Sequence, residues 1–270
     1  MADLLRLLGT GWACAAGVMI LLWLSQLRTR NAGIVDVGWA AITGSLAILY
    51  GLLGDGDPSR RILLAVLGGV WGWRLAWHLW RDRIWKQPEE GRYVTLRKQW
   101  SPHPDRAFFI FFQAQALAAV VLSLPFALAG RAPQAFPAVT DLAALALVVI
   151  GVAGETVADR QLVAFKRDPA SRGRTCRAGL WRYSRHPNYF GEFLIWWGFY
   201  LVALPAGGWW TVYAPLLMSF LLLRVSGVVL MEKDIGERRP AYRAYVARTS
   251  AFFPWPPTPA MPRAREEYQQ

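Results

Sequence analysis

The chain has 270 residues with a formal net charge of +12, and 54% of its residues are hydrophobic. The apolar residues form long runs instead of short periodic stripes, which is typical of membrane helices and argues against an ordinary soluble domain. Zinc sites and Rossmann-type nucleotide sites are disfavoured, because the two cysteines have no metal-binding spacing and the CxxC, HExxH and strand-linked GxGxxG motifs are absent.

Seven apolar segments follow one another along the chain, each near the ~20 residues that cross a ~30 Å hydrocarbon core. We expect transmembrane helices at 9–26, 33–53, 62–80, 107–129, 138–158, 189–204 and 209–231. The first segment is interpreted as a retained span, because Asp3 precedes it and no small-residue cleavage site is evident. The predicted fold class is an all-α polytopic integral membrane protein, with one domain over 1–255 and a flexible Pro-rich tail over 256–270.

The basic residues test this topology. It places 24 of the 30 Lys and Arg residues on one side and four on the other, while Arg74 and Arg224 lie inside spans. Because positively charged loops stay cytoplasmic, we expect an external N-terminus and a cytoplasmic C-terminus. The charges fit attraction to anionic lipid, at ~1 kcal/mol each near the surface, or a binding site for a phosphate-bearing ligand. Nucleic acid is not an expected partner, since no aromatic-basic platform stands apart from the membrane segments.

Ionisable residues at membrane depth are candidates for function, because a charge there costs several kcal/mol unless it is paired or hydrated. Several stand four residues apart, on one face of a predicted helix, and nearly all lie in the cytoplasmic halves of their spans. This pattern predicts a polar cavity open to the cytoplasm, although mutual pairing of the acids with Arg74 and Arg224 is an alternative. The residues are Asp36 in the second span; Arg74, His78, Asp82 and Arg83 in or after the third; Glu155, Asp159 and Lys166 in or after the fifth; Asn188 and Glu192 in the sixth; and Arg224 and Glu232 in the seventh.

The available side chains favour chemistry carried by a cofactor. No Ser or Cys neighbours a His in a recognisable nucleophile motif, and three histidines with few other ligands make a poor zinc site. A cofactor enzyme needs the protein mainly for orientation and electrostatics, which scattered charged residues can supply.

Two stretches carry a family resemblance, "GLWRYSRHPNYFGEF" at 179–193 and "AYRAYVARTSAFFPW" at 241–255. They resemble the C-terminal domain of the steroid 5α-reductase family, in particular its bacterial branch. The similarity is specific over about 150–255 and extends more weakly to 71–83 and 31–40. The resemblance implies a seven-helix enzyme of the bacterial inner membrane that binds NADPH in its cytoplasmic half, as a monomer or homodimer. It implies reduction of a carbon–carbon double bond conjugated to a ketone, in a lipophilic substrate that arrives from the bilayer.

The resemblance also implies roles for individual residues. Asn188 and Glu192 correspond to an asparagine and a glutamate that contact the nicotinamide end, and Asp159 and Lys166 correspond to an acidic and a basic cofactor contact. Asp82 is a departure, because the family has asparagine before the arginine that Arg83 matches. The remaining expected cofactor contacts are Arg74, Glu155, Tyr183, Arg185, His186, Arg224, Glu232, Tyr242, Tyr245 and Arg248. Many of the aromatic residues, Tyr183 among them, also suit an interfacial belt.

The substrate half departs further from the steroid enzymes, in which a glutamate and a tyrosine bind the ketone. The nearest equivalents here are Asp36 and, by alignment, Trp71, which can donate a hydrogen bond but cannot deliver a proton. We expect a protonated Asp36 to stabilise the developing oxyanion, since burial raises the pKa of a carboxyl group. His78 or a water molecule is the alternative donor. Steroid specificity does not follow from these residues.

Two other functions remain open at this stage. "SRHPNYFGE" also resembles a segment of isoprenylcysteine carboxyl methyltransferases, which bind S-adenosylmethionine, and a sterol- or lipid-binding protein without catalysis would need the apolar cavity alone. The segment with Glu90, Arg92 and Tyr93 suits either a solvated loop or a lid over the nucleotide.

Overall fold

The computed structural model describes residues 2–225 and 241–258, and within these ranges every regular element is a helix. The longer helices are α1 (Ala2–Thr29), α2 (Ile34–Leu53), α3 (Pro58–Leu79), α4 (Gly91–Gln99), α5 (Pro104–Leu122), α6 (Leu124–Ala129), α7 (Val139–Arg167), α8 (Pro187–Ala203), α9 (Tyr213–Phe220) and α12 (Ala241–Val246). Short helical turns are η1 (Trp80–Ile84), η2 (Pro169–Ser171), η3 (Gly179–Arg182), η4 (Leu204–Ala206), η5 (Gly208–Val212) and η6 (Leu221–Val225).

Among the described residues, six helices are long and apolar enough to cross a membrane, as judged by length and composition. They cover Ala2–Thr29, Ile34–Leu53, Pro58–Ile84, Pro104–Ala129, Val139–Arg167 and Pro187–Ala206. The predicted all-α, polytopic membrane class is therefore confirmed. The seventh predicted span is helical from Gly208 to Val225, and its last residues, 226–231, lie outside the described part of the chain.

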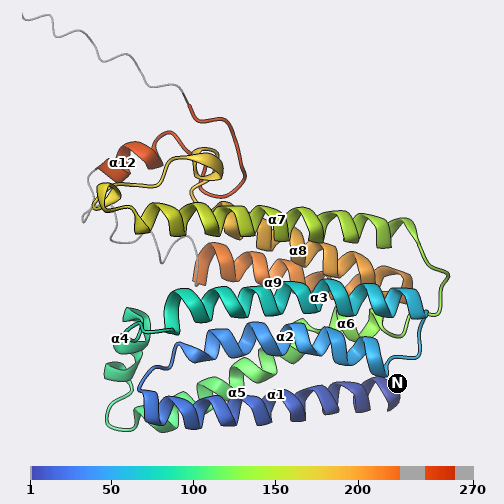
Figure 1. The fold of residues 1–270 in the computed structure, drawn as a ribbon. Coiled ribbons are helices and arrows are strands. Elements are labelled where there is room, and N and C mark those ends of the chain that lie inside the picture. The colour runs from blue at the N-terminus through green and yellow to red at the C-terminus, as the bar shows by residue number, and fades with distance from the viewer. Residues whose placement is uncertain (1, 226–240, 259–270) are drawn as a thin grey trace, which may run out of the picture. The chain divides into compact units, whose positions relative to one another are not determined.

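The chain divides into two compact units, and α7 and α8 each contribute to both. Unit 1 comprises residues 1–148 and 197–214, and unit 2 comprises 149–196 and 215–270. In unit 1, α2 packs against α1 and α3, and α5 packs against α1 and α2 (Figure 1). The contact between α2 and α3 uses glycine: a Cβ atom on Gly44 would lie 2.9 Å from the carbonyl oxygen of Gly68. Such close backbone approach is the usual role of small residues between membrane helices.

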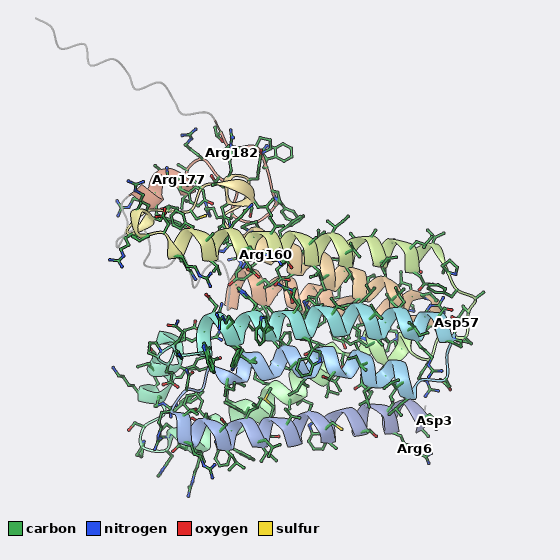
Figure 2. All side chains as sticks on the ribbon, viewed as in Figure 1. Asp3, Arg6, Asp57, Arg160, Arg177 and Arg182 are labelled. Atoms are coloured by element: carbon green, nitrogen blue, oxygen red, sulfur yellow. The ribbon has the colours of Figure 1, made fainter. Side chains whose placement is uncertain are left out.

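Unit 1 is polar at both ends of its helices. Asp3, Arg6 and Asp57 lie at the end where the chain begins, and α4 lies at the other end (Figures 1 and 2). Asp57 starts α3 by accepting hydrogen bonds from the backbone N–H groups of Ser59 and Arg60, which the helix itself leaves without partners.

The same end holds a fully buried ion pair. The guanidinium of Arg60 donates to both carboxylate oxygens of Asp141, at 2.9 and 2.7 Å, and to the carbonyl oxygens of Ala132, Gln134 and Ala135. Neither charged side chain is exposed. The carbonyl bonds satisfy the guanidinium that burial has removed from water, so this pair fastens the connection before α7 to the start of α3.

In unit 2, α7 and α8 cross at glycine. A Cβ on Gly151 would lie 2.6 Å from the carbonyl oxygen of Gly191, and a Cβ on Gly191 would lie 2.7 Å from that of Gly151. Gly191 belongs to the "HPNYFGE" stretch, so part of that motif serves helix packing. The crossing lies one turn from Glu155 on α7 and one turn from Asn188 on α8, and it brings their faces together.

The C-terminal segment of unit 2 folds onto the start of α8. The backbone N–H of Arg185 donates to Ser250 O at 2.9 Å, and its guanidinium donates to Val246 O and Thr249 O. The hydroxyl of Ser184 donates to Phe252 O at 2.8 Å. The polar residues before α8 are therefore a platform that holds residues 246–252 of the same chain.

Candidate functional site

The first candidate site lies at the start of α2 in unit 1, where three polar side chains meet. Asp36 stands in the first turn of α2, and its carboxylate accepts a hydrogen bond from Tyr93 Oη at 2.8 Å and pairs with the guanidinium of Arg92. Arg92 also donates to Tyr93 Oη at 2.7 Å. We call these three residues the Asp36 triad.

The triad combines burial with partial access. Tyr93 is almost fully buried, whereas the side chains of Asp36 and Arg92 are 25% and 29% exposed. Burial, followed by the charge of Asp36, raises the pKa of Tyr93 well above its ordinary value. The Nε of Arg92 is buried and has no hydrogen-bond partner among the described residues. The triad therefore holds a protonated phenol and a guanidinium with an unused donor.

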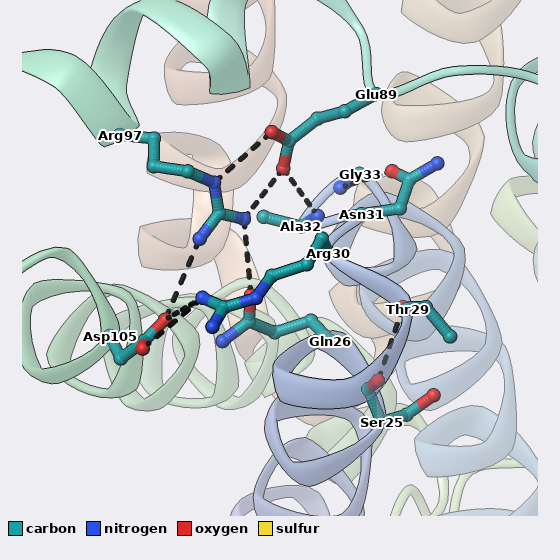
Figure 3. Close-up of polar contacts among 10 residues, drawn as sticks. All are labelled: Ser25, Gln26, Thr29, Arg30, Asn31, Ala32, Gly33, Glu89, Arg97 and Asp105. Atoms are coloured by element: carbon teal, nitrogen blue, oxygen red, sulfur yellow. Dashed lines mark hydrogen bonds and ion pairs between the residues drawn. The ribbon is translucent and has the colours of Figure 1, made fainter.

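A polar network, drawn in Figure 3, holds α4 in place for this triad. The carboxylate of Glu89 accepts from the guanidinium of Arg97 at 2.8 and 3.2 Å and from the backbone N–H of Ala32 at 2.8 Å. Arg97 also donates to Gln26 at 3.2 Å and pairs with Asp105 at 3.5 Å. Glu89 precedes α4 and Arg97 lies in its last turn, so both ends of α4 are tied to the α1–α2 connection, the end of α1 and the start of α5.

The second candidate site lies in unit 2, on the facing sides of α7 and α8. The Nδ2 of Asn188 donates to Asp159 Oδ1 at 3.3 Å, and Glu192 accepts from the indole N–H of Trp196 at 2.9 Å. Glu155, Asp159 and Glu192 are each about 95% buried. We call Glu155, Asp159, Asn188 and Glu192 the α7–α8 cluster. A buried acid in a membrane helix is costly unless it is paired or hydrated, which marks the cluster as a candidate binding site.

Other predicted residues of unit 1 occupy varied positions. Trp71 is fully buried, and its ring packs edge-on against Trp39 at 6.3 Å and Phe199 at 5.3 Å. It is a fully buried residue, and the structure brings Tyr93 to Asp36. Half-buried positions on α3 and on the π-helical turn η1 hold Arg74, His78, Asp82 and Arg83, the last of which pairs with Glu90 at 3.4 Å.

In unit 2, several residues expected to contact cofactor form hydrogen bonds that hold the C-terminal segment. Tyr245 Oη donates to Trp181 O, and it also lies 3.3 Å from Ser184 O. Arg185 bonds the carbonyls described above, and Arg248 Nε donates to Thr258 O at 2.9 Å. His186 is buried and stacks on the Tyr189 ring at 5.4 Å.

The rest of the predicted set is more scattered. Tyr242 is buried, and its ring lies 5.6 Å from that of Tyr245. Tyr183 is 41% exposed, and Lys166 and Arg224 are also exposed. Glu232 lies outside the described residues.

The α7–α8 cluster offers a buried hydrogen-bond acceptor to a ligand. The Oδ1 of Asn188 is buried and accepts no hydrogen bond from the described residues, so it matches an N–H donor such as a carboxamide. Basic residues lie in the C-terminal part of α7 and after it, and Figure 2 labels Arg160 in the helix and Arg177 and Arg182 beyond its end. Guanidinium groups suit the phosphates of such a ligand.

Sequence reasoning missed Tyr93 as the partner of Asp36. The two residues are 57 positions apart, and Tyr93 lies in a short polar helix whose sequence shows no apolar stripe. The unusual feature of this helix is that a tyrosine in a charged stretch is buried, and the sequence alone does not reveal burial.

The comparisons with known proteins place the chain in a family. The family described as "Protein of unknown function (DUF1295)" matches residues 22–249. A protein of Schizosaccharomyces pombe, named "Uncharacterized protein C594.04c", is 32% identical over 263 residues, which cover 86% of this chain and 75% of that protein. No solved structure matches the chain significantly. Because the family match covers most of the sequence, this chain belongs to the DUF1295 family.

Proposed function

We propose that this protein is a membrane-embedded reductase that uses NADPH to reduce a carbon–carbon double bond conjugated to a ketone, in a steroid-like or other lipophilic substrate. The observation that carries the proposal is the Asp36 triad. It places a guanidinium with an unused buried donor beside a protonated tyrosine at the cytoplasmic end predicted for α2. This pair of groups is suited to a carbonyl oxygen that becomes an oxyanion.

Arg92 and Tyr93 have complementary roles in this proposal. Arg92 Nε donates to the carbonyl oxygen and stabilises the negative charge that develops there. Tyr93 then turns its O–H, which donates to Asp36 in the resting site, to the enolate oxygen and gives up the phenolic proton, and Arg92 stabilises the tyrosinate that remains. The chemistry that a bound NADPH supplies is a hydride for the β-carbon.

Asp36 positions the other two residues. In this proposal Asp36 orients the triad and is not the proton donor, because it pairs with Arg92. It also accepts a hydrogen bond from Tyr93, so it fixes both the phenol and the guanidinium. The proton-donor role therefore passes from Asp36 to Tyr93, and the tyrosine that the steroid-reductase resemblance requires is Tyr93 instead of Trp71.

The α7–α8 cluster is the cofactor site of this proposal. Asn188 Oδ1 accepts from the nicotinamide carboxamide, while Asp159 orients the Asn188 amide through the hydrogen bond to its Nδ2. We place the enzyme in a bacterial inner membrane with its C-terminus in the cytoplasm, where NADPH is available. The support for this orientation is the excess of basic residues in the loops on one side.

Binding to detergent-purified protein tests the cofactor. NADPH, NADH and S-adenosylmethionine are titrated side by side, and we expect NADPH to bind. Asn188→Leu should weaken NADPH binding at least about tenfold, which is about 1.4 kcal/mol, because a buried acceptor is lost. Gln113→Leu is the matched control, since Gln113 is also a partly buried membrane-helix amide with an unbonded nitrogen, but lies in α5.

The outcomes separate the candidate functions. S-adenosylmethionine binding without nicotinamide binding would replace the reductase with a methyltransferase. Lipid or sterol binding without any cofactor binding would leave a non-catalytic carrier. If NADPH binds, NADPH oxidation is followed with enones from steroids to polyprenyl ketones. We expect Tyr93→Phe to lose turnover on any accepted enone while it keeps NADPH affinity.

A further inference from the structure

The C-terminal segment exposes a group of large apolar side chains beside α8. Phe253 is 58% exposed and Trp255 is 71% exposed, and Tyr183 next to them is 41% exposed. Trp255 is fixed at this place by its backbone N–H, which donates to Tyr183 O at 2.9 Å. An exposed aromatic group of this kind marks a surface that contacts another phase or another molecule.

The segment lies along the part of α8 that enters the membrane. The ring of Phe253 packs against Phe190 and Phe193, with ring centroids 5.8 Å away in both cases. α8 starts at Pro187 within a membrane-crossing helix. At 1.5 Å per residue, Phe190 and Phe193 lie roughly 4–9 Å along the axis from that start. An interfacial helix buries its apolar side chains about 5–10 Å into the boundary between head groups and acyl chains, which is a similar length.

Basic residues surround the aromatic group. Arg182 and Arg248 are exposed, and Arg248 is tied to Thr258 by two bonds, because its Nε donates to Thr258 O and its carbonyl accepts from Thr258 N. In the sequence, Trp255 lies between Arg248 and Thr258, the two residues that these bonds join. Aromatic rings flanked by arginine match the interface of a membrane that contains anionic lipid.

We propose that residues 252–258, together with Tyr183, Arg182 and Arg248, form an interfacial anchor that binds anionic lipid beside α8. The aromatic rings enter the head-group region, and the arginines contact the phosphates. The anchor also fixes the start of α8, because Ser184 and Arg185 hold residues 246–252. This inference does not depend on the proposed enzyme activity.

The test uses full-length protein without Cys14 and Cys176, reconstituted in nanodiscs. A bimane label is placed at Phe253→Cys or Trp255→Cys, and its fluorescence is compared with and without lipids brominated near the head group. We expect strong quenching by bromine and weak quenching by water-soluble iodide. Arg172→Cys is the matched control, because it is an exposed position of unit 2 among polar neighbours. A label there should show the opposite pattern.

The contribution of charge is measured in the same system. Quenching by brominated lipid should be larger in discs with phosphatidylglycerol than in pure phosphatidylcholine, and Arg182→Gln combined with Arg248→Gln should remove that difference. Labels at 253 and 255 that behave like the label at 172 would overturn the anchor, and would point to a protein partner or to solvent. Equal quenching in both lipids would overturn the preference for anionic lipid. Unfolding temperatures verify that each labelled variant is folded.

Discussion

Replacement of Gly191 by alanine tests whether close helix contact builds the α7–α8 cluster. The new Cβ would lie 2.7 Å from Gly151 O and 3.0 Å from both the backbone N and the Cβ of Glu155. Ordinary contact begins at 3.4 Å, so the shortest distance falls short by 0.7 Å against backbone atoms that cannot rotate away. The helices must therefore separate, and overpacking of this size costs about 1–3 kcal/mol.

The same separation should reach the α7–α8 cluster. Asn188 is one turn from Gly191, and its hydrogen bond to Asp159 is already 3.3 Å long, near the limit for such a bond. We therefore expect Gly191→Ala to lower the free energy of unfolding in mixed micelles by about 1–3 kcal/mol. It should also weaken NADPH binding, in so far as that cluster is the cofactor site.

Gly154 provides the matched control on α7. A Cβ there would meet nothing within 4 Å. Gly154→Ala should leave stability unchanged or raise it by up to about 1 kcal/mol, because alanine favours the helix. Equal stability of Gly191→Ala and Gly154→Ala would refute the packing argument. If Gly191→Ala loses stability but keeps its NADPH affinity, the packing argument stands and the α7–α8 cluster is not the cofactor site.

Two further predictions concern unit 1. Arg60→Leu leaves a buried carboxylate without its partner and should lower the free energy of unfolding by about 3–5 kcal/mol. Arg61→Leu, at a more exposed position, should lower it much less. Comparable losses of stability in the two variants would contradict the role assigned to the buried pair. Glu89→Gln should loosen α4 and shift the ¹⁹F resonance of a fluorotyrosine placed at Tyr93, and Arg97→Gln should shift it in the same direction. Arg30→Gln, which removes a largely exposed pair at the edge of that network, should leave the resonance in place. An unshifted resonance in both network variants would show that the network does not position the triad.

The sequence was sufficient for the membrane architecture because hydrocarbon thickness imposes a length on every crossing helix. Six of the expected spans appear with boundaries shifted by a few residues, mostly outward. α7 is the largest case, since it runs to Arg167 instead of ending near 158. Charged residues extend such a helix beyond the bilayer, and hydropathy alone does not report that extension.

The i,i+4 pairs were predicted from helical periodicity alone, and the structure brings the Glu155–Asp159 and Asn188–Glu192 pairs to facing sides of two helices. Gly191 explains why they face each other, because the absence of a side chain there lets the two backbones touch. Local periodicity finds such faces, but the contact between them depends on which helices cross.

Sequence reasoning was least able to assign roles to residues whose partners are far away in the sequence or are backbone atoms. Tyr93 meets Asp36 through the placement of α4, which in turn depends on Glu89 and its bond to the N–H of Ala32. Arg185 bonds three backbone groups of the C-terminal segment, and a carbonyl acceptor leaves no mark on residue identity. The sequence of the polar stretch before α8 therefore suggests a ligand site, whereas its hydrogen bonds show that it holds the C-terminal segment.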